Sequence, residues 1–162
     1  MLIKGIIDTD TVNYKKISMT IEFPYCSFKC DKECGRAVCQ NSPLANEKNI
    51  NIPRDKIINR YLNNPITEAI VCQGLEPFDS ISELYQFISD LREVYHCKDD
   101  VVIYTGYTKE ELAEYLPLFY FLDPIIIKYG RYIPDQEPHY DEVLGVNLAS
   151  DNQYAERLQY VH

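Results

Sequence analysis

The sequence predicts an α/β protein with a mostly parallel sheet, because short apolar runs alternate with amphipathic stretches along the chain. Residues 67–72, 101–105 and 125–127 are apolar runs with the length and β-branched content of buried strands. The stretches between them carry apolar residues at helical spacing. Strands that alternate with helices are joined by right-handed crossovers, so we expect parallel neighbours with a binding site at their C-terminal ends.

Two more strands are expected before this alternation begins. Residues 2–8 and residues 17–23 have the apolar alternation and β-branched content that are typical of strands. Residues 8–11, with the sequence Asp-Thr-Asp-Thr, are expected to form the turn between them. The chain after residue 23 is then expected to leave the sheet as a loop.

Two helices are expected to pack on this sheet through apolar stripes. The first covers residues 53–62, with Pro53 in its first turn, and its inward-facing residues are expected to be Ile57, Ile58, Tyr61 and Leu62. The second begins at a capping box formed by Ser80 and Glu83. Its stripe is expected to contain Ile81, Leu84, Phe87, Ile88, Leu91, Val94 and Tyr95.

A third helix is expected near the C-terminal half of the sheet. Thr108 and Glu111 have the spacing of a second capping box, and residues 112–119 continue the helical pattern. Pro117 is expected to kink or end this helix, because proline has no N–H and clashes with the preceding turn.

Four of the six cysteines, Cys26, Cys30, Cys34 and Cys39, fall within fourteen residues of the predicted loop. A structural zinc site would use all four, but such sites favour two CxxC-like pairs around a longer spacer, and the gaps here are three, three and four residues. Disulfides suit small secreted chains, and no apolar signal segment is recognised here. An iron–sulfur cluster held by three thiolates would leave one iron open for a small ligand.

Four short motifs occur in an order that one known family shows. They are residues 39–43 (Cys-Gln-Asn-Ser-Pro), 73–77 (Gln-Gly-Leu-Glu-Pro), 103–107 (Ile-Tyr-Thr-Gly-Tyr), and the pair 123–132 with 150–153 (Ser-Asp-Asn-Gln). Their order and spacing resemble the radical S-adenosylmethionine (SAM) superfamily, and most closely the activating proteins of anaerobic ribonucleotide reductases. The alternation of strands and helices places these motifs on one rim. Pattern and resemblance together therefore predict a single-domain incomplete (βα) barrel over residues 1–162.

The resemblance implies that Cys26, Cys30 and one further cysteine hold a [4Fe–4S] cluster. The family's cluster motif is CxxxCxxC, whereas in this chain Cys34 and Cys39 both follow the first pair. One of these two cysteines is therefore surplus to the cluster, or the loop is altered.

Cys39 is favoured as the third ligand. In the family, the residue before the last cluster cysteine often lies against the adenine of SAM, which suits the apolar Val38 and does not suit Glu33. Residues 31–37 would then be an insertion. The alternative has Cys34 as the ligand and Cys39 as a small buried hydrophobe.

The resemblance also implies where SAM binds, although it predicts no catalytic side chain. Gly74 would let the backbone approach the methionine moiety, and Glu76 would accept a hydrogen bond from its ammonium group. Thr105 would bond ribose or carboxylate, or would satisfy only its own backbone. Lys128 or Arg131 could meet the SAM carboxylate, but a solvated surface charge is the preferred interpretation of both. Without the cysteines, the turn around Gly74 and Glu76 would be interpreted as an ordinary strand-to-helix turn.

The function implied by the resemblance is reductive cleavage of SAM to a 5′-deoxyadenosyl radical. This radical would install a glycyl radical on the large subunit of an anaerobic ribonucleotide reductase, with a flavodoxin or ferredoxin-type reductant as electron donor. One alternative is a radical SAM enzyme that acts on a small molecule, as the 7-carboxy-7-deazaguanine synthases do. Another is a non-catalytic zinc or iron–sulfur interaction module.

Composition excludes some other classes of function. The formal net charge is −9, which argues against nucleic acid and anionic membrane surfaces as partners because both require basic patches. No apolar run approaches the eighteen residues of a membrane span. Six cysteines without a recognised export signal make the reducing cytoplasm the expected location.

Overall fold

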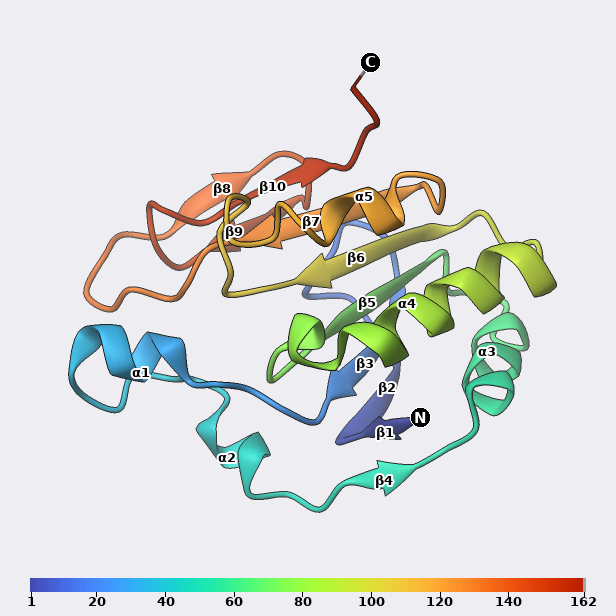
Figure 1. Ribbon diagram of the computed structural model, residues 1–162, viewed down its shortest axis with the longest axis horizontal. Helices are drawn as coiled ribbons and strands as arrows, with labels where there is room; N and C mark the ends of the chain where they lie inside the picture. Colours follow the sequence, from blue (N-terminus) through green and yellow to red (C-terminus); the bar gives the residue numbers. More distant parts are fainter. Residues whose placement is uncertain (162) are drawn as a thin grey trace.

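A computed structural model of the protein describes residues 1–161, with a six-stranded sheet at its centre (Figure 1). Its strands are β2 (Gly5–Asp10), β3 (Ser18–Phe23), β5 (Ala69–Gly74), β6 (Asp100–Tyr104), β7 (Ile125–Tyr129) and β10 (Tyr154–Arg157). The spatial order is β10-β7-β6-β5-β3-β2. The four central strands are parallel and both edge strands are antiparallel to their neighbours. The α/β class and the mostly parallel sheet are confirmed, whereas the incomplete barrel stays a prediction.

Two small antiparallel pairs flank this sheet. They are β1 (Leu2–Ile3) with β4 (Ile50–Asn51), and β8 (His139–Asp141) with β9 (Val146–Leu148). The predicted first strand is thus divided into β1 and β2. Strands β4, β8, β9 and β10 were not predicted from the sequence.

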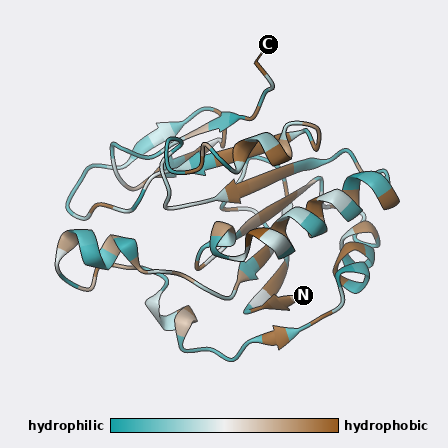
Figure 2. Ribbon diagram, viewed as in Figure 1, coloured by the Kyte–Doolittle hydropathy of each residue, from teal (hydrophilic) through white to brown (hydrophobic). Residues whose placement is uncertain are grey.

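Helices cover one face of the sheet. They are α3 (Arg54–Leu62), the 3₁₀ turn η1 (Pro77–Ser80), α4 (Ile81–Ser89), the π-helical turn η2 (Asp90–Val94) and α5 (Leu116–Phe119). Alternate strand residues such as Ile21, Ile70 and Ile103 join the helices in the main core. The other face carries a smaller core, which includes Val71 and is closed by Leu148 of β9. Figure 2 shows the central strands as hydrophobic ribbons between these two coverings.

The helix predictions are correct in position and partly wrong in detail. Leu62, expected to face inward, is 43% exposed because α3 ends there. Val94 is 64% exposed, because the helix after Ser89 continues as a π-helical turn that takes this residue out of the helical stripe. The capping box at Ser80 is wrong. The Ser80 hydroxyl has no hydrogen-bond partner, and the Glu76 side chain caps the preceding 3₁₀ turn instead.

The second capping box is confirmed, although little helix follows it. The Thr108 N–H donates to Glu111 Oε2 (2.9 Å), and the Glu111 N–H donates to Thr108 Oγ1 (3.2 Å). Residues 109–115 form turns, and only α5 is helical. Pro117 lies in the first turn of α5 rather than at a kink or at its end, because its missing N–H leaves no bond unmade there.

The chain between β3 and β4, residues 24–49, carries the four clustered cysteines and is called the cysteine segment. It leaves the sheet after β3, as expected, and contains two short helices. These are α1 (Lys29–Cys34) and α2 (Ser42–Ala45), and neither has a buried residue. Figure 2 shows α1 as a mostly hydrophilic ribbon. Because β3, β5, β6 and β7 run parallel, this segment and the chain after each of the other three strands meet at one edge of the sheet.

Candidate metal centre

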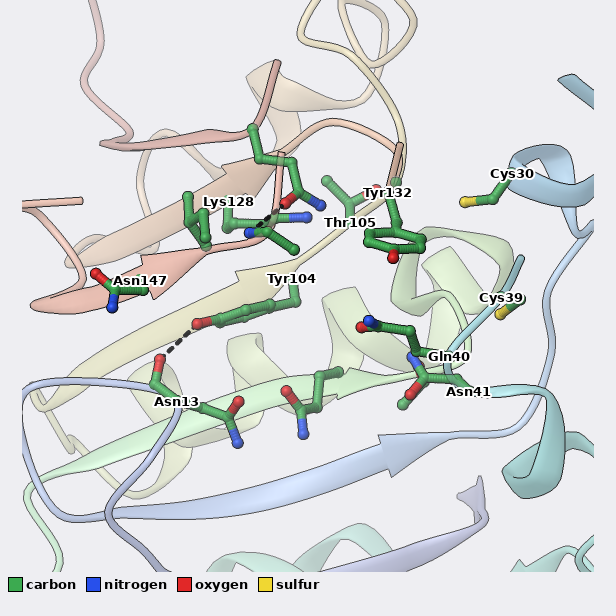
Figure 3. A pocket seen from close by; sticks show the side chains of 16 residues that line it. Asn13, Cys30, Cys39, Gln40, Asn41, Tyr104, Thr105, Lys128, Tyr132 and Asn147 are labelled. Carbon is green, nitrogen blue, oxygen red and sulfur yellow. Dashed lines mark hydrogen bonds between the residues drawn. The ribbon is translucent and has the colours of Figure 1, made fainter. Parts of the chain in front are cut away.

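Two adjoining cavities lie at the C-terminal edge of the parallel strands. The larger has a volume of about 330 Å³ and is bordered by Cys30, Cys39, Thr105 and Lys128 (Figure 3). The smaller has a volume of about 30 Å³, and its walls include Cys26, Cys30, Glu76 and Arg131. Cys30 borders both cavities, so the two are parts of one site.

Three of the four clustered cysteines border this site, and the fourth does not. Cys26, Cys30 and Cys39 line one or both cavities, whereas Cys34, the last residue of α1, lines neither. Within residues 1–161, no three His, Cys, Asp or Glu side chains converge closely enough to hold a single metal ion. A [4Fe–4S] cluster presents separate irons to separate thiolates, so its ligands surround a volume rather than meet at one point. Three soft thiol donors distributed over two adjoining cavities fit such a cluster.

Burial disfavours the ionisation of two thiols at the site, Cys26 and Cys30. Burial raises the pKa of Cys26 to about 11, against the effect of a hydrogen bond to its sulfur from the Phe28 N–H (3.2 Å). Burial also raises the pKa of Cys30, while the positive charges of Arg131 and Lys128 act in the opposite direction. A cluster must bind these residues as thiolates, so a metal that binds Cys26 must displace its proton.

Glu76 is the most connected side chain at the site. It is 4% exposed and accepts hydrogen bonds from Thr105 Oγ1 (2.8 Å), the Gly106 N–H (2.8 Å) and the Phe78 N–H (3.1 Å). Burial raises its pKa to about 7, although these three donors lower it. Glu76, which was predicted to bind the ammonium of SAM, therefore also joins the end of β5 to the end of β6. Its Oε2 atom accepts one of the three bonds and retains acceptor capacity.

Gly74 lies against β3 rather than facing an open approach. Its φ of 95° is in the left-handed region, and a Cβ atom there would lie 2.7 Å from the Phe23 backbone nitrogen. The Gly74 carbonyl accepts a hydrogen bond from Asn41 Nδ2 (2.8 Å), which ties the cysteine segment to β5. Close packing between strands thus requires a glycine here, and the residue also borders the larger cavity.

The other predicted site residues differ in how they meet the cavities. Thr105 is buried, borders the larger cavity and donates to Glu76, so its hydroxyl does more than satisfy its own backbone. Val38 is half-buried beside Cys39 and borders neither cavity. Gln153 is buried, and its amide joins the Ser150 N–H to the Gly130 carbonyl at the cavity wall.

Lys128 and Arg131 are buried, so the interpretation of both as solvated surface charges is wrong. Lys128 is 7% exposed, and its ammonium donates to the Gly130 carbonyl (2.9 Å). Burial lowers the pKa of Lys128 to about 8. Arg131 is 8% exposed and forms ion pairs with Glu111 (2.6 Å) and Glu33 (3.2 Å). The sequence signal for Lys128 was its place directly after the apolar run of residues 125–127, and Arg131 follows three residues later.

Several residues of the site were not predicted. Tyr132, Gln40, Gln73 and Asn147 border the larger cavity, and none of these four side chains has a hydrogen bond within the part of the chain that the structure describes. Figure 3 shows Gln40 near Cys39 and Asn147 at the far end of the cavity. Asn147 belongs to β9, a strand that no sequence pattern predicted.

An α/β fold with three thiols at two adjoining cavities presents soft donors of the kind that iron–sulfur proteins use. The model of a protein family described as a 4Fe-4S single cluster domain matches residues 17–153. The chain belongs to this family, which supports an iron–sulfur cofactor. No curated protein and no solved structure gives a significant match to the chain. No helix of residues 1–161 has both the length and the apolar character that a bilayer crossing requires.

Proposed function

We propose that the protein is a radical SAM enzyme in which Cys26, Cys30 and Cys39 hold a [4Fe–4S] cluster. The observation that carries this proposal is one continuous site that has three thiols on one side and the polar ends of the parallel strands on the other. When bound, the cluster supplies one electron to the sulfonium of SAM, whose bond to C5′ then breaks to give methionine and a 5′-deoxyadenosyl radical.

Lys128 is suited to bind the carboxylate of SAM. Its ammonium has three N–H donors, and the Gly130 carbonyl accepts from only one of them. A buried ammonium at a cavity wall forms strong, charge-assisted hydrogen bonds with an anionic group. Glu76 is suited to the ammonium of SAM, because Oε2 retains acceptor capacity beside Cys26 and Cys30. Both residues would orient the ligand beside the thiols.

The size of the larger cavity favours a substrate that inserts only a thin segment. Its volume of about 330 Å³ is near the lower end of the range of roughly 300 to 1,000 Å³ for pockets that hold one drug-sized ligand. With SAM in place, little room remains for a second complete small molecule. A peptide loop could present one glycine Cα–H to C5′ of the radical, which would take the hydrogen atom and leave a glycyl radical. We therefore propose an anaerobic ribonucleotide reductase large subunit as substrate, and a flavodoxin or ferredoxin-type protein as reductant.

A small-molecule substrate is the second candidate, and three carboxamide side chains that border the larger cavity favour it. Gln40, Gln73 and Asn147 border the cavity without side-chain hydrogen bonds among residues 1–161. Carboxamides offer donor and acceptor pairs, which suit a polar heterocycle with an amide-like edge as well as a peptide.

The deciding experiment uses protein purified and reconstituted without oxygen. With SAM and dithionite, it should release 5′-deoxyadenosine and methionine, detected by mass spectrometry. Addition of an anaerobic reductase should then give a glycyl radical, detected by electron paramagnetic resonance. A full, reducible cluster that releases no 5′-deoxyadenosine would reject the enzyme and favour a non-catalytic module. Cleavage without a glycyl radical would favour the small-molecule substrate.

A further inference from the structure

The Asp31 carboxylate joins the two ends of the segment between Cys30 and Cys39. Its Oδ1 atom accepts hydrogen bonds from the backbone N–H groups of Val38 (2.7 Å) and Cys39 (2.8 Å). Asp31 directly follows Cys30 in the chain. One side chain therefore connects two cysteines that are separated by eight residues of sequence.

Burial does little to fix this segment. Neither α1 nor α2 contains a buried residue, and residues 35–37 are exposed. Polar contacts must therefore hold Cys39 in place. Its carbonyl accepts a hydrogen bond from Ser42 Oγ (2.8 Å), and its N–H donates to Asp31. The bond to Asp31 is charge-assisted and is the stronger of these two kinds of contact.

Cys34 is the natural competitor of Cys39. Residues four apart on a helix are neighbours on one face, and Cys30 and Cys34 have this spacing on α1. Cys34 nevertheless borders neither cavity, whereas Cys39 borders the larger one. Some feature of the segment therefore brings the more distant thiol to the site.

We propose that Asp31 is a positioning residue that places the Cys39 thiol beside Cys30 and so selects Cys39 over Cys34 as the third cluster ligand. This inference rests on the proposed cluster site. The carboxylate acts through the backbone of Cys39 and does not itself bind iron. It allows the segment to present the Cys39 thiol at the larger cavity, which Cys30 also borders.

The first test measures the positions of the thiols without any metal. Apo-protein is alkylated with iodoacetamide, and the rate at each cysteine is followed by peptide mass spectrometry. Asp31→Ala should raise the rate at Cys39 by about tenfold, the effect of losing a hydrogen bond to a charged group, and leave the rate at Cys34 unchanged. Asp31→Asn retains an acceptor oxygen and should restore most of the protection. The matched control is Asp135→Ala. This change removes an exposed ion pair with Arg36, which lies between Cys30 and Cys39, and should leave the alkylation rate at Cys39 unchanged.

The second test measures iron after anaerobic reconstitution, with no SAM present. Asp31→Ala should retain less than half of the iron of the unchanged protein, and any remaining iron should be lost in Asp31→Ala/Cys34→Ala. Cys34→Ala alone should retain the full iron content. Circular dichroism identifies a variant that has not folded, in which case Asp31→Asn provides the comparison.

Unchanged alkylation of Cys39 together with full iron in Asp31→Ala would overturn the inference. Loss of iron from Cys34→Ala alone would also overturn it, because Cys34 would then be the ligand. Neither readout depends on SAM cleavage. A protein that behaves as expected in both tests but releases no 5′-deoxyadenosine would reject the proposed function and leave the role of Asp31 standing.

Discussion

Thr105 donates a hydrogen bond to Glu76 over 2.8 Å between Oγ1 and Oε1, and this bond joins the ends of two neighbouring parallel strands. The same carboxylate accepts from the N–H groups of Phe78 and Gly106. A buried polar group that loses its hydrogen-bond partner still bears its full desolvation penalty. Glu76 therefore stabilises the edge of the sheet on which the proposed SAM site is built.

The first prediction is that Glu76→Ala lowers the free energy of unfolding of the apo-protein by about 2 to 4 kcal/mol, because three donors lose their buried acceptor. Urea denaturation measures this loss. Thr105→Val removes a single donor and should cost about 1 kcal/mol. The exposed Glu68 is the matched control, and Glu68→Ala should change stability by less than about 0.5 kcal/mol. A Glu76→Ala effect as small as that of the control would contradict the structural role.

Local sequence patterns predicted the elements well where tertiary contacts agree with them. The box at Thr108 and Glu111 forms as expected because neither residue is buried and each side chain bonds the other's N–H group. The box at Ser80 does not form, because Glu76 and Pro77 start a 3₁₀ turn that already begins the helix. No local pattern distinguishes these two cases, since the difference lies in a buried carboxylate held by the next strand.

The charged residues of the site were the hardest to predict. Lys128 and Arg131 resemble solvated charges in sequence, and they are buried by chain that folds back near the C-terminus. Asn152 Nδ2, for example, donates to the Arg131 carbonyl (2.8 Å). In the sequence, a glycine at position 145 was the one available signal for the turn of the β8–β9 pair. Gly145, with φ of 73°, packs against Lys15 at the turn between the two strands, where a Cβ atom would lie 2.6 Å from Lys15 Cβ.

The second prediction concerns stability at acid pH and rests on Asp100, at the opposite end of the sheet. Its carboxylate accepts hydrogen bonds from Lys16 Nζ (2.7 Å), Tyr14 Oη (2.9 Å) and Arg157 Nη2 (3.2 Å). Burial alone would raise the pKa of Asp100, but the bonds from Lys16 and Tyr14 outweigh it and hold the pKa below its usual value of 3.8. Because the pKa is lower in the folded state, the stabilisation is present above pH 3.8 and is lost as the pH falls further.

Asp100→Asn should therefore destabilise the apo-protein by about 1 to 3 kcal/mol at pH 7, and by less at pH 3. Urea denaturation of both proteins at the two pH values measures the difference. Asp123, which forms no side-chain hydrogen bond or ion pair within residues 1–161, is the control. If Asp100→Asn lowers the free energy of unfolding by the same amount at both pH values, the carboxylate charge is not the cause.

The third prediction concerns Lys128, whose ammonium is proposed to bind the SAM carboxylate. Lys128→Met keeps the apolar stem and removes the charge, so SAM should bind about tenfold to a hundredfold more weakly at unchanged iron content. Anaerobic equilibrium dialysis with labelled SAM measures the affinity. Lys109→Met removes a surface ion pair with Glu156 and should leave the affinity unchanged. Equal SAM affinity in the two lysine variants would rule out contact between Lys128 and the carboxylate.

The last prediction tests the ligand set itself by comparing the four clustered cysteines. Cys26, Cys30 and Cys39 border the two cavities, and Cys34 borders neither. Alanine at any of the first three should prevent stable assembly of a [4Fe–4S] cluster, because Cys thiolates hold such a cluster and the change removes one of the three. Cys34→Ala should assemble close to four irons per chain, with the absorption and reduced-state paramagnetic resonance of the unchanged protein. The buried Cys72 is the matched control, since Cys72→Ala alters a cysteine of the core and no thiol of the site.

If Cys39→Ala keeps the cluster and Cys34→Ala loses it, the third ligand is Cys34, and the segment must rearrange when the cluster binds. Stoichiometric zinc without iron after anaerobic reconstitution would instead reject the cluster.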